Sequence, residues 1–362
     1  MRKGVIVGLT AYEMKKIFCI PALWFFFVLS LLFNILLIFG QGDERDYFDQ
    51  VRAWAEESGF SAGEEDNVFA GYHTEKLAAF YADTVKESPV AIRWVERKYA
   101  LLQPRVEHLA ESGAALDFYV GDATYESHQF LFGLLVRAVL AEAGICAMLV
   151  VLYLMGYEQM NCTAGQVCAS RTGRKLWWNK LAAAVLSAVA LYVLLAVITL
   201  LVYFGTWDYS GVWQDSVSSR FNYLTDMLYT RPFLTWHDFT VGEYLVAVLL
   251  LGTALVVVFG LMAAVCAIVF RNIYGAALAL AIVLFGGTGL GSLFSQCKAW
   301  GFYFITTMQP ASVWLSVNVW FTESGISTFL PWQETISVAF NLIVCCILVM
   351  ILLRCFMRRD IV

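Results

Sequence analysis

Six long apolar runs constrain this chain more than any other feature of its sequence. They occupy residues 17–40, 131–156, 180–207, 244–270, 273–295 and 334–354. A helix of about 20 apolar residues is long enough to cross the hydrocarbon core of a bilayer. Helices also satisfy their own backbone hydrogen bonds, which lipid cannot do for them. The sequence therefore predicts an all-α polytopic membrane protein with six transmembrane helices.

The overall composition agrees with this class. Only 15% of the residues are charged and 60% are hydrophobic, whereas ordinary soluble domains carry roughly 25% charged residues. The first apolar run is also longer than the apolar core of a signal peptide, which is roughly 7–15 residues, so we expect it to be retained as a helix. A soluble enzyme is a poor fit to this composition.

Basic residues gather in the short segments that an even number of spans places on one side. The two terminal segments, the loop after the second run and the turn after the fourth run carry 12 lysines and arginines against three acids, counting Lys180 and Arg354 at the borders of the neighbouring runs. The segments of the other side carry 25 acids against 11 basic residues, counting Glu334 at the border of the sixth run. Short cytosolic segments of membrane proteins are rich in lysine and arginine. We therefore predict that both termini are cytosolic and that the acidic segments are extracellular.

Residues 41–130 form the one sizeable polar segment, which we predict to be an extracellular helical domain. Apolar side chains recur through it at helical spacing: Leu77, Phe80, Tyr81, Val85, Trp94, Val95, Leu102, Val106 and Leu109. Its three histidines, His73, His108 and His128, lack the spacing of metal ligands. No metal site is expected.

Two segments near the end of the chain depart from simple spans. The fifth run contains a cluster of glycines at positions 286 to 291, which predicts a broken or closely packed helix. Residues 296–333 are nearly uncharged, rich in tryptophan and phenylalanine, and interrupted by Pro310 and Pro331. This composition predicts re-entrant or interfacial helices in the outer leaflet. Residues 208–243, which are polar and aromatic, are expected to form an extracellular connection.

Few polar side chains fall inside the predicted spans. Glu142 lies in the second span and is expected to face the bundle interior, because an ionised side chain in lipid is costly. Arg137 lies five residues earlier, about 140° around the helix, so it cannot easily pair with Glu142. Asn34 of the first span, Glu142 and Asn341 of the sixth span are the candidates for a transport path. Structural pairing of Glu142 with another helix is an equally good interpretation.

The loop at residues 157–179 is suited to contact a partner. Thr163 and Gln166 have the spacing of a capping box, so a short helix is predicted to begin there. Gly173 then breaks the helix, and basic residues lead into the third span. Six residues of this loop are candidates for coupling: Glu158, Thr163, Gln166, Arg171, Arg174 and Lys175. For the charged ones, a simple membrane-edge charge is the alternative interpretation.

The order of these elements resembles that of ABC-2 type ABC-transporter permeases, which are membrane-spanning subunits without an ATPase domain. In that family an acidic residue ends the second membrane helix, a coupling helix rich in small residues follows, and a Gly/Ser-Arg pair and a lysine open the next helix. The matching positions are Glu158, residues 163–170, Gly173-Arg174 and Lys180.

Other segments extend the resemblance over nearly the whole chain. The basic residues 1–16 resemble the interfacial elbow helix of the family, and residues 296–333 resemble its outer-leaflet helices. The large domain between the first two spans resembles the subset related to sodium or drug exporters and peptide-immunity permeases. Residues 355–362 are expected to form a cytosolic tail.

The resemblance implies an exporter that is driven by other subunits. The chain has no GxxxxGK[ST] phosphate loop, so we expect it not to be an enzyme and to hold no cofactor of its own. ATP and Mg would bind to two separate ABC ATPase subunits. A second permease chain, identical or different, is the other implied partner, and no nucleic acid is expected. The implied location is the cell (plasma) membrane of a bacterium.

The mechanism that this resemblance implies begins at the cytosolic loop. Closure of the ATPase pair would push on the helix at residues 163–170, and the second and third spans would transmit the push. Glu158 would anchor the helix end, and Arg171 and Arg174 would contact the ATPase. The cargo would be amphipathic, a peptide, drug or lipid-like molecule. Two alternatives stay open: a membrane receptor or immunity protein that binds an extracellular ligand, and an ion (sodium) extruder of the same family.

Overall fold

Six helices in the computed structural model are long and apolar enough to cross a membrane. The structure describes residues 3–60, 63–169, 173–225, 230–270 and 272–358. The six segments are α2 (Pro21–Gly40), Gly121–Met160 with α7 (Arg137–Met160) at its end, α9 (Leu176–Thr206), α10 (Val241–Val269), α11 (Ile273–Gln296) and α14 (Gln333–Arg358). The prediction of a helical polytopic protein with six membrane-length helices is confirmed.

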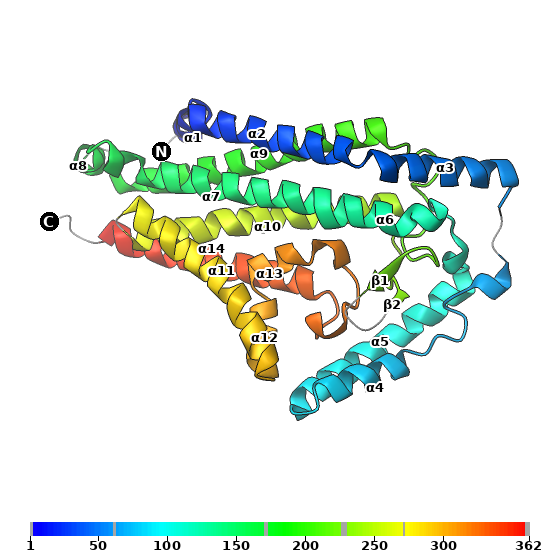
Figure 1. The fold of residues 1–362 in the computed structure, drawn as a ribbon. Helices are drawn as coiled ribbons and strands as arrows, with labels where there is room; N and C mark the ends of the chain where they lie inside the picture. The colour runs from blue at the N-terminus through cyan, green and yellow to red at the C-terminus, as the bar shows by residue number, and fades with distance from the viewer. Residues whose placement is uncertain (1–2, 61–62, 170–172, 226–229, 271, 359–362) are drawn as a thin grey trace.

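Helix α7 lies in the middle of the bundle and contacts α2, α9, α10 and α11 (Figure 1). Its apolar side chains are buried on nearly every face, including Leu140, Ala147, Val151 and Leu154. Helix α14 packs on the far side of α10. A helix that is apolar all round and placed at the centre is what a membrane bundle core requires.

The two chain ends lie at the same end of the bundle, which we call the terminal end (Figure 1). Helix α1 (Lys3–Phe18) lies there and packs against α7 and α9. A tight turn at Cys19 and Ile20 joins α1 to α2, and Pro21 fits the first turn of α2 because its missing N–H has no helical partner there. The short helix α8 (Ala164–Ala169) lies at this end too.

The polar segment forms helices at the opposite end, which we call the domain end (Figure 1). Helix α3 (Gly42–Ser58) follows α2 almost directly, and α4 (Thr74–Thr84) and α5 (Pro89–Ser112) form a helical hairpin. Ser88 caps α5 by accepting a hydrogen bond from the Ala91 N–H at 3.3 Å.

The packing of the hairpin follows the apolar spacing of the sequence. Seven of the predicted positions are buried: Leu77, Tyr81, Val85, Val95, Leu102, Val106 and Leu109. Phe80 departs from the pattern, since 39% of it is exposed. The same core includes Trp300 and Phe329 from the segment before α14. The domain is thus packed onto the rest of the chain rather than tethered by a linker.

Several short elements complete the described chain. They are α6 (Thr124–His128), α12 (Trp300–Thr307), α13 (Pro310–Leu315), and the 3-10 turns η1 (Glu64–Asp66), η2 (Ala114–Leu116), η3 (Gly121–Ala123), η5 (Gly173–Lys175), η6 (Val317–Val319) and η7 (Gly325–Ser327). A two-stranded antiparallel sheet, β1 (Tyr223–Thr225) with β2 (Thr230–Pro232), pairs Leu224 with Arg231. This sheet was not predicted from the sequence and is a small exception to an all-α fold.

The second span enters the bundle through a π-helix, η4 (Gln129–Val136), which continues α6 into α7. The wider turns place Gln129 against η6, where Asn318 Nδ2 donates to Gln129 Oε1 at 3.2 Å. The sequence carries no clear signal for this conformation, because the apolar run continues unchanged through it.

The glycine cluster of the fifth run does not break its helix. Helix α11 runs without interruption through these residues, so the expectation of a broken helix is wrong. The expectation of close packing is confirmed at two glycines. A Cβ at Gly287 would collide with the Gln309 side chain, and one at Gly291 would lie 3.0 Å from Thr306 Oγ1.

Candidate functional site

Four charged side chains from three helices meet at the terminal end of the bundle. Glu13 and Lys16 belong to α1, Glu158 to the last turn of α7, and Lys180 to the first turns of α9. We call these residues the terminal charge cluster. Glu13 and Lys180 are each only 1% exposed, and Glu158 is 6% exposed. The cluster is therefore inside the protein rather than on its rim.

Each charge of the cluster has an opposite partner. Lys180 pairs with Glu158 and donates a hydrogen bond to the Leu154 carbonyl at 3.0 Å. Lys16 Nζ lies 2.9 Å from Glu13 Oε1 and 3.8 Å from Glu158 Oε1. A buried ion pair is tolerated only when its charges stay paired, and separating them is strongly unfavourable. The cluster therefore fastens α1, α7 and α9 together at this end.

The aromatic ring of Tyr157 contacts the ammonium groups of both lysines in the cluster. The Tyr157 ring lies 4.7 Å from Lys16 Nζ and 6.0 Å from Lys180 Nζ. Ammonium groups are attracted to the face of an aromatic ring, and the attraction grows where water is excluded. Tyr157 thus holds both cations beside Glu158.

The loop helix α8 begins directly from this cluster. The Thr163 N–H donates to the Glu158 carbonyl at 2.9 Å, and the Val167 N–H donates to the Thr163 carbonyl at 3.0 Å. Helix α8 begins at Ala164, next to the position that the capping-box spacing indicated. None of its residues is buried. Glu158 is thus bonded to α9 through its side chain and to the start of the loop through its backbone.

The other candidate coupling residues are placed as follows. Gln166 is exposed on α8, and Lys175 is exposed at the end of η5, where it precedes α9. Arg171 lies outside the described residues. Arg174 lies in η5, but its side chain is not among those described. The capping box between Thr163 and Gln166 stays a prediction.

Most of the terminal charge cluster was not predicted from the sequence. Glu13 and Lys16 were taken only as part of a basic N-terminal segment, although their separation of three residues places them on one face of a helix. Lys180 entered only through the family resemblance. Nothing in the sequence indicates that α1 lies against the ends of α7 and α9.

A second polar cluster lies inside the bundle between α2, α7 and α9. Asn34 Nδ2 donates to Glu142 Oε2 at 2.9 Å and lies 3.2 Å from Thr199 Oγ1. Asn34 is fully buried, Glu142 is half-buried, and the Asn34 Oδ1 atom has no hydrogen-bond partner among the described residues. The structure thus brings two of the three candidate path residues together and adds Thr199, which the sequence analysis missed.

Asn341, the third candidate for the transport path, does not join this cluster. Its amide donates to the Met308 carbonyl at 2.8 Å and to the Ser337 carbonyl at 2.7 Å. Both partners lie on the α12 to α14 side of the molecule. Its contacts are therefore those of a residue that fastens α14 to the end of α12.

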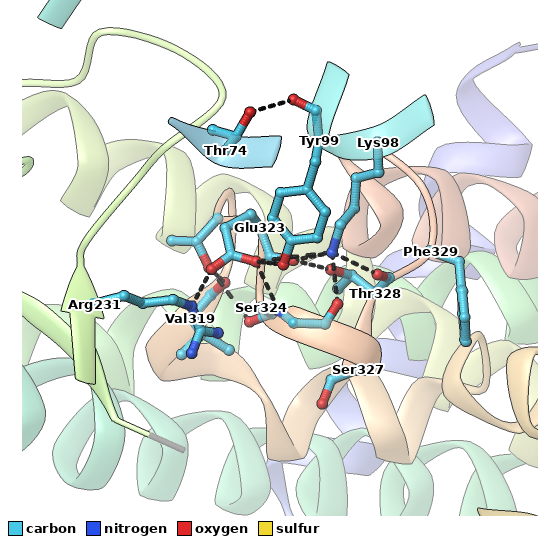
Figure 2. Close-up of polar contacts among 12 residues, drawn as sticks. Thr74, Lys98, Tyr99, Arg231, Val319, Glu323, Ser324, Ser327, Thr328 and Phe329 are labelled. Atoms are coloured by element: carbon cyan, nitrogen blue, oxygen red, sulfur yellow. Dashed lines mark hydrogen bonds and ion pairs between the residues drawn. The ribbon is translucent and has the colours of Figure 1, made fainter. Parts of the chain in front are cut away.

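A third cluster of buried charges fastens the domain to the segment before α14 (Figure 2). Glu323 accepts hydrogen bonds from the Tyr99 hydroxyl at 2.6 Å and the Gly325 N–H at 2.8 Å, and it pairs with Arg231. Lys98 Nζ donates to the carbonyls of Glu323 at 2.7 Å and Gly325 at 2.5 Å. We call Glu323, Lys98, Arg231 and Tyr99 the domain anchor.

Burial and neighbouring charges set the ionisation of the domain anchor. Burial lowers the pKa of Lys98 to about 8, although Glu323 opposes the shift. Burial alone would raise the pKa of Glu323, but the charges of Arg231 and Lys98 outweigh it and leave that pKa lowered. Burial also raises the pKa of Tyr99, which stays neutral and donates its proton to Glu323. Glu323, Lys98 and Arg231 are therefore ionised near neutral pH, whereas Tyr99 is neutral.

Neither a metal centre nor a known relative identifies the site. The described part of the chain contains no group of three or more His, Cys, Asp or Glu side chains that could hold a metal ion. A scan against protein-family models, a search of curated proteins and a search of solved structures each gave no match. The geometry of the clusters is therefore the basis for a functional proposal.

Proposed function

We propose that this chain is the membrane-spanning permease subunit of an ABC exporter, which moves an amphipathic cargo outward and is driven by separate ATPase subunits. The observation that carries the proposal is the attachment of the exposed helix α8 to the buried terminal charge cluster. Because the exposed helix α8 is hydrogen-bonded to this buried cluster, it can transmit a force from a partner to α7 and α9. The resemblance of the loop to that of ABC-2 type permeases supports the same function.

In this proposal α7 and α9 act as one unit. A push on α8 reaches Glu158 through the Thr163 backbone, and the Glu158–Lys180 pair passes it to α9. Glu142 lies 16 residues before Glu158 on α7, about 24 Å along a helix of 1.5 Å rise per residue. Movement of α7 and α9 against α2 would change the contacts of Asn34 with Glu142 and Thr199, and so open or close a path between these helices.

The partners belong to the same proposal. Two ATPase subunits would dock at the terminal end, which we place in the cytosol of a bacterial cell, with the domain end outside the plasma membrane. A second permease chain would complete the path. Helix α11 exposes several large apolar side chains, among them Tyr274, Leu278 and Phe285, at 82%, 63% and 73%. Such a surface suits either lipid or a second chain.

The experiment starts with affinity purification of the tagged chain from its native membrane. We expect a nucleotide-hydrolysing protein to copurify, and we then measure ATP hydrolysis by the complex in lipid nanodiscs. Glu158→Ala should lower this activity by about tenfold or more, because Lys180 is left buried without its partner and the terminal charge cluster loosens. Arg174→Ala should weaken binding of the ATPase itself.

The control is Lys15→Ala, which removes an exposed charge from α1 at the same end of the bundle. It should leave ATP hydrolysis and ATPase binding unchanged. Membrane insertion of all three variants is checked by their yield and size-exclusion profile. Purification of the chain without any ATPase, or unchanged hydrolysis in Glu158→Ala together with unchanged binding in Arg174→Ala, would count against the proposal.

The polar cluster inside the bundle favours ion (sodium) extrusion as a second function. The Glu142 carboxylate, the Thr199 hydroxyl and the unpartnered Asn34 Oδ1 are all oxygen atoms, which are the ligands that hard cations take. Replacement of sodium by choline in the same hydrolysis measurement separates the two functions. Dependence of hydrolysis on sodium that Glu142→Gln abolishes would favour ion extrusion.

A further inference from the structure

A pocket of about 670 Å³ lies between the second half of α11, helices α12 and α13, and the start of α14. Pockets that bind small organic molecules have volumes of roughly 300–1,000 Å³. Most of the residues that line this pocket carry a hydroxyl group. None of those lining residues belongs to the three charge or polar clusters described above.

Seven hydroxyl groups of the pocket donate their proton to a backbone carbonyl and present lone pairs as acceptors. Ser337 donates its proton to the Gln333 carbonyl at 2.6 Å, Ser312 to the Thr306 carbonyl at 2.8 Å, and Thr288 to the Phe285 carbonyl at 2.8 Å. A hydroxyl group has one proton and two lone pairs. Since the protons are committed to the backbone, the lone pairs are what each of these groups has left for a ligand.

Among the described residues that line the pocket, one is acidic. Glu334 lines the pocket and is only 5% exposed, and its Oε1 atom is buried without a hydrogen-bond partner among the described residues. None of the described residues that line the pocket is a lysine, arginine or histidine. A buried carboxylate oxygen without a donor is unfavourable, and a cationic donor would relieve this.

We propose that this pocket binds a ligand through a protonated primary amine. An ammonium group has three N–H donors and no acceptor, so it complements a wall of hydroxyl lone pairs beside the carboxyl group of Glu334. An ammonium group would stabilise the ionised form of the buried Glu334 carboxyl group, which a neutral polyol or an anion would not do. A free hydroxylated amine and the headgroup of an ethanolamine lipid share this chemistry. The proposal does not depend on the export function.

The experiment uses the full chain in nanodiscs of phosphatidylcholine, whose quaternary headgroup carries no N–H donor. Isothermal titration calorimetry compares glucosamine with glucose, which differ by an ammonium group in place of one hydroxyl. We expect glucosamine to bind saturably and at least about tenfold more tightly than glucose, because hydrogen bonds between charged groups are the strong ones. Glu334→Gln should remove this difference.

Two further variants make the result interpretable. Glu96→Gln makes the same chemical change at an exposed position of α5 and should leave glucosamine binding unchanged. Ser337→Ala removes one hydroxyl of the pocket, one turn after Glu334, and should weaken glucosamine binding several-fold. This second pocket variant decides the matter if Glu334→Gln does not fold.

Nanodiscs that contain phosphatidylethanolamine separate the two sources of the amine. Weaker glucosamine binding in these nanodiscs would show that the lipid headgroup enters the pocket, and unchanged binding would favour a free amine. Equal binding of glucose and glucosamine, or binding that neither Glu334→Gln nor Ser337→Ala changes, would overturn the proposal. Saturable binding of sodium that displaces glucosamine at millimolar concentration would also overturn it, in favour of an alkali-cation site.

Discussion

Glu323 illustrates how a single side chain can join distant parts of this chain. Its carboxylate receives the Tyr99 hydroxyl of α5 and pairs with Arg231 of β2, while its own backbone carbonyl accepts a hydrogen bond from Lys98. These partners lie 92 to 225 positions away in the sequence. In the sequence Glu323 is one of two charged residues in the aromatic segment at residues 296–333. No spacing rule connects it to its partners, so its role becomes visible only when the tertiary structure is known.

We predict that Glu323→Gln lowers the free energy of unfolding of the domain end by about 3–5 kcal/mol, because it leaves two buried cations without their carboxylate. The measurement is thermal unfolding of the purified chain in detergent. Lys86→Met is the control. It removes the exposed pair of Lys86 with Asp83 on the same hairpin and should have little measurable effect. Equal melting temperatures for Glu323→Gln and wild type would contradict the assigned role.

The same variant gives a test of acid dependence. The pKa of Glu323 is lowered by Arg231 and Lys98 against the effect of burial, so the stabilisation by its charge is present above the ordinary value of 4.5. That stabilisation is lost as the pH falls through the lower pKa of the folded state. The difference in melting temperature between wild type and Glu323→Gln should therefore be full at neutral pH and shrink below pH 4.5.

At the scale of helices, the sequence predicted the length of the membrane-spanning helices but not which helices pack against each other. The six apolar runs indicated six membrane-length helices, because length and hydropathy alone determine that property. The glycine cluster of α11 predicted close packing on that helix. Very close packing also occurs at Gly252 of α10, where it was not predicted. A Cβ there would lie 2.7 Å from Leu140 Cδ2 and 2.8 Å from the Tyr192 hydroxyl. A lone glycine in an apolar run does not reveal which helices face it.

Two glycines give a matched test of this packing. Gly252→Ala should destabilise the bundle by about 1–3 kcal/mol, since the Leu140 and Tyr192 side chains must shift to admit the methyl group. Gly289→Ala places the same group on α11 with no neighbouring atom within 4 Å, so it should be neutral or stabilising by up to about 1 kcal/mol. Thermal unfolding in detergent compares the two. A Gly252→Ala protein as stable as Gly289→Ala would show that α10 is packed more loosely than described.

At the scale of the whole molecule, the charge distribution of the sequence predicts which segments lie on the same side of the membrane. The arrangement of the chain can be compared with this prediction. Both chain ends and α8 lie at one end of the bundle, and the acidic domain lies at the other (Figure 1). Such an arrangement follows from an even number of spans. The clusters inside the protein could not be predicted from the charge distribution. Pairing across a bundle depends on the rotation and depth of each helix, and a count of charges contains neither.

Two native cysteines can report the orientation. Cys162 lies between α7 and α8 at the terminal end, and Cys297 follows α11, next to Lys298, which pairs with Glu87 of the domain. Both thiols are free and exposed. If short basic segments are cytosolic, a membrane-impermeant maleimide should label Cys297 in intact cells and Cys162 only after permeabilisation. Peptide mass spectrometry identifies the labelled residue without any substitution. Labelling of Cys162 in intact cells, with Cys297 protected, would place the acidic domain in the cytosol and α8 outside, where an ATP-driven partner could not reach it.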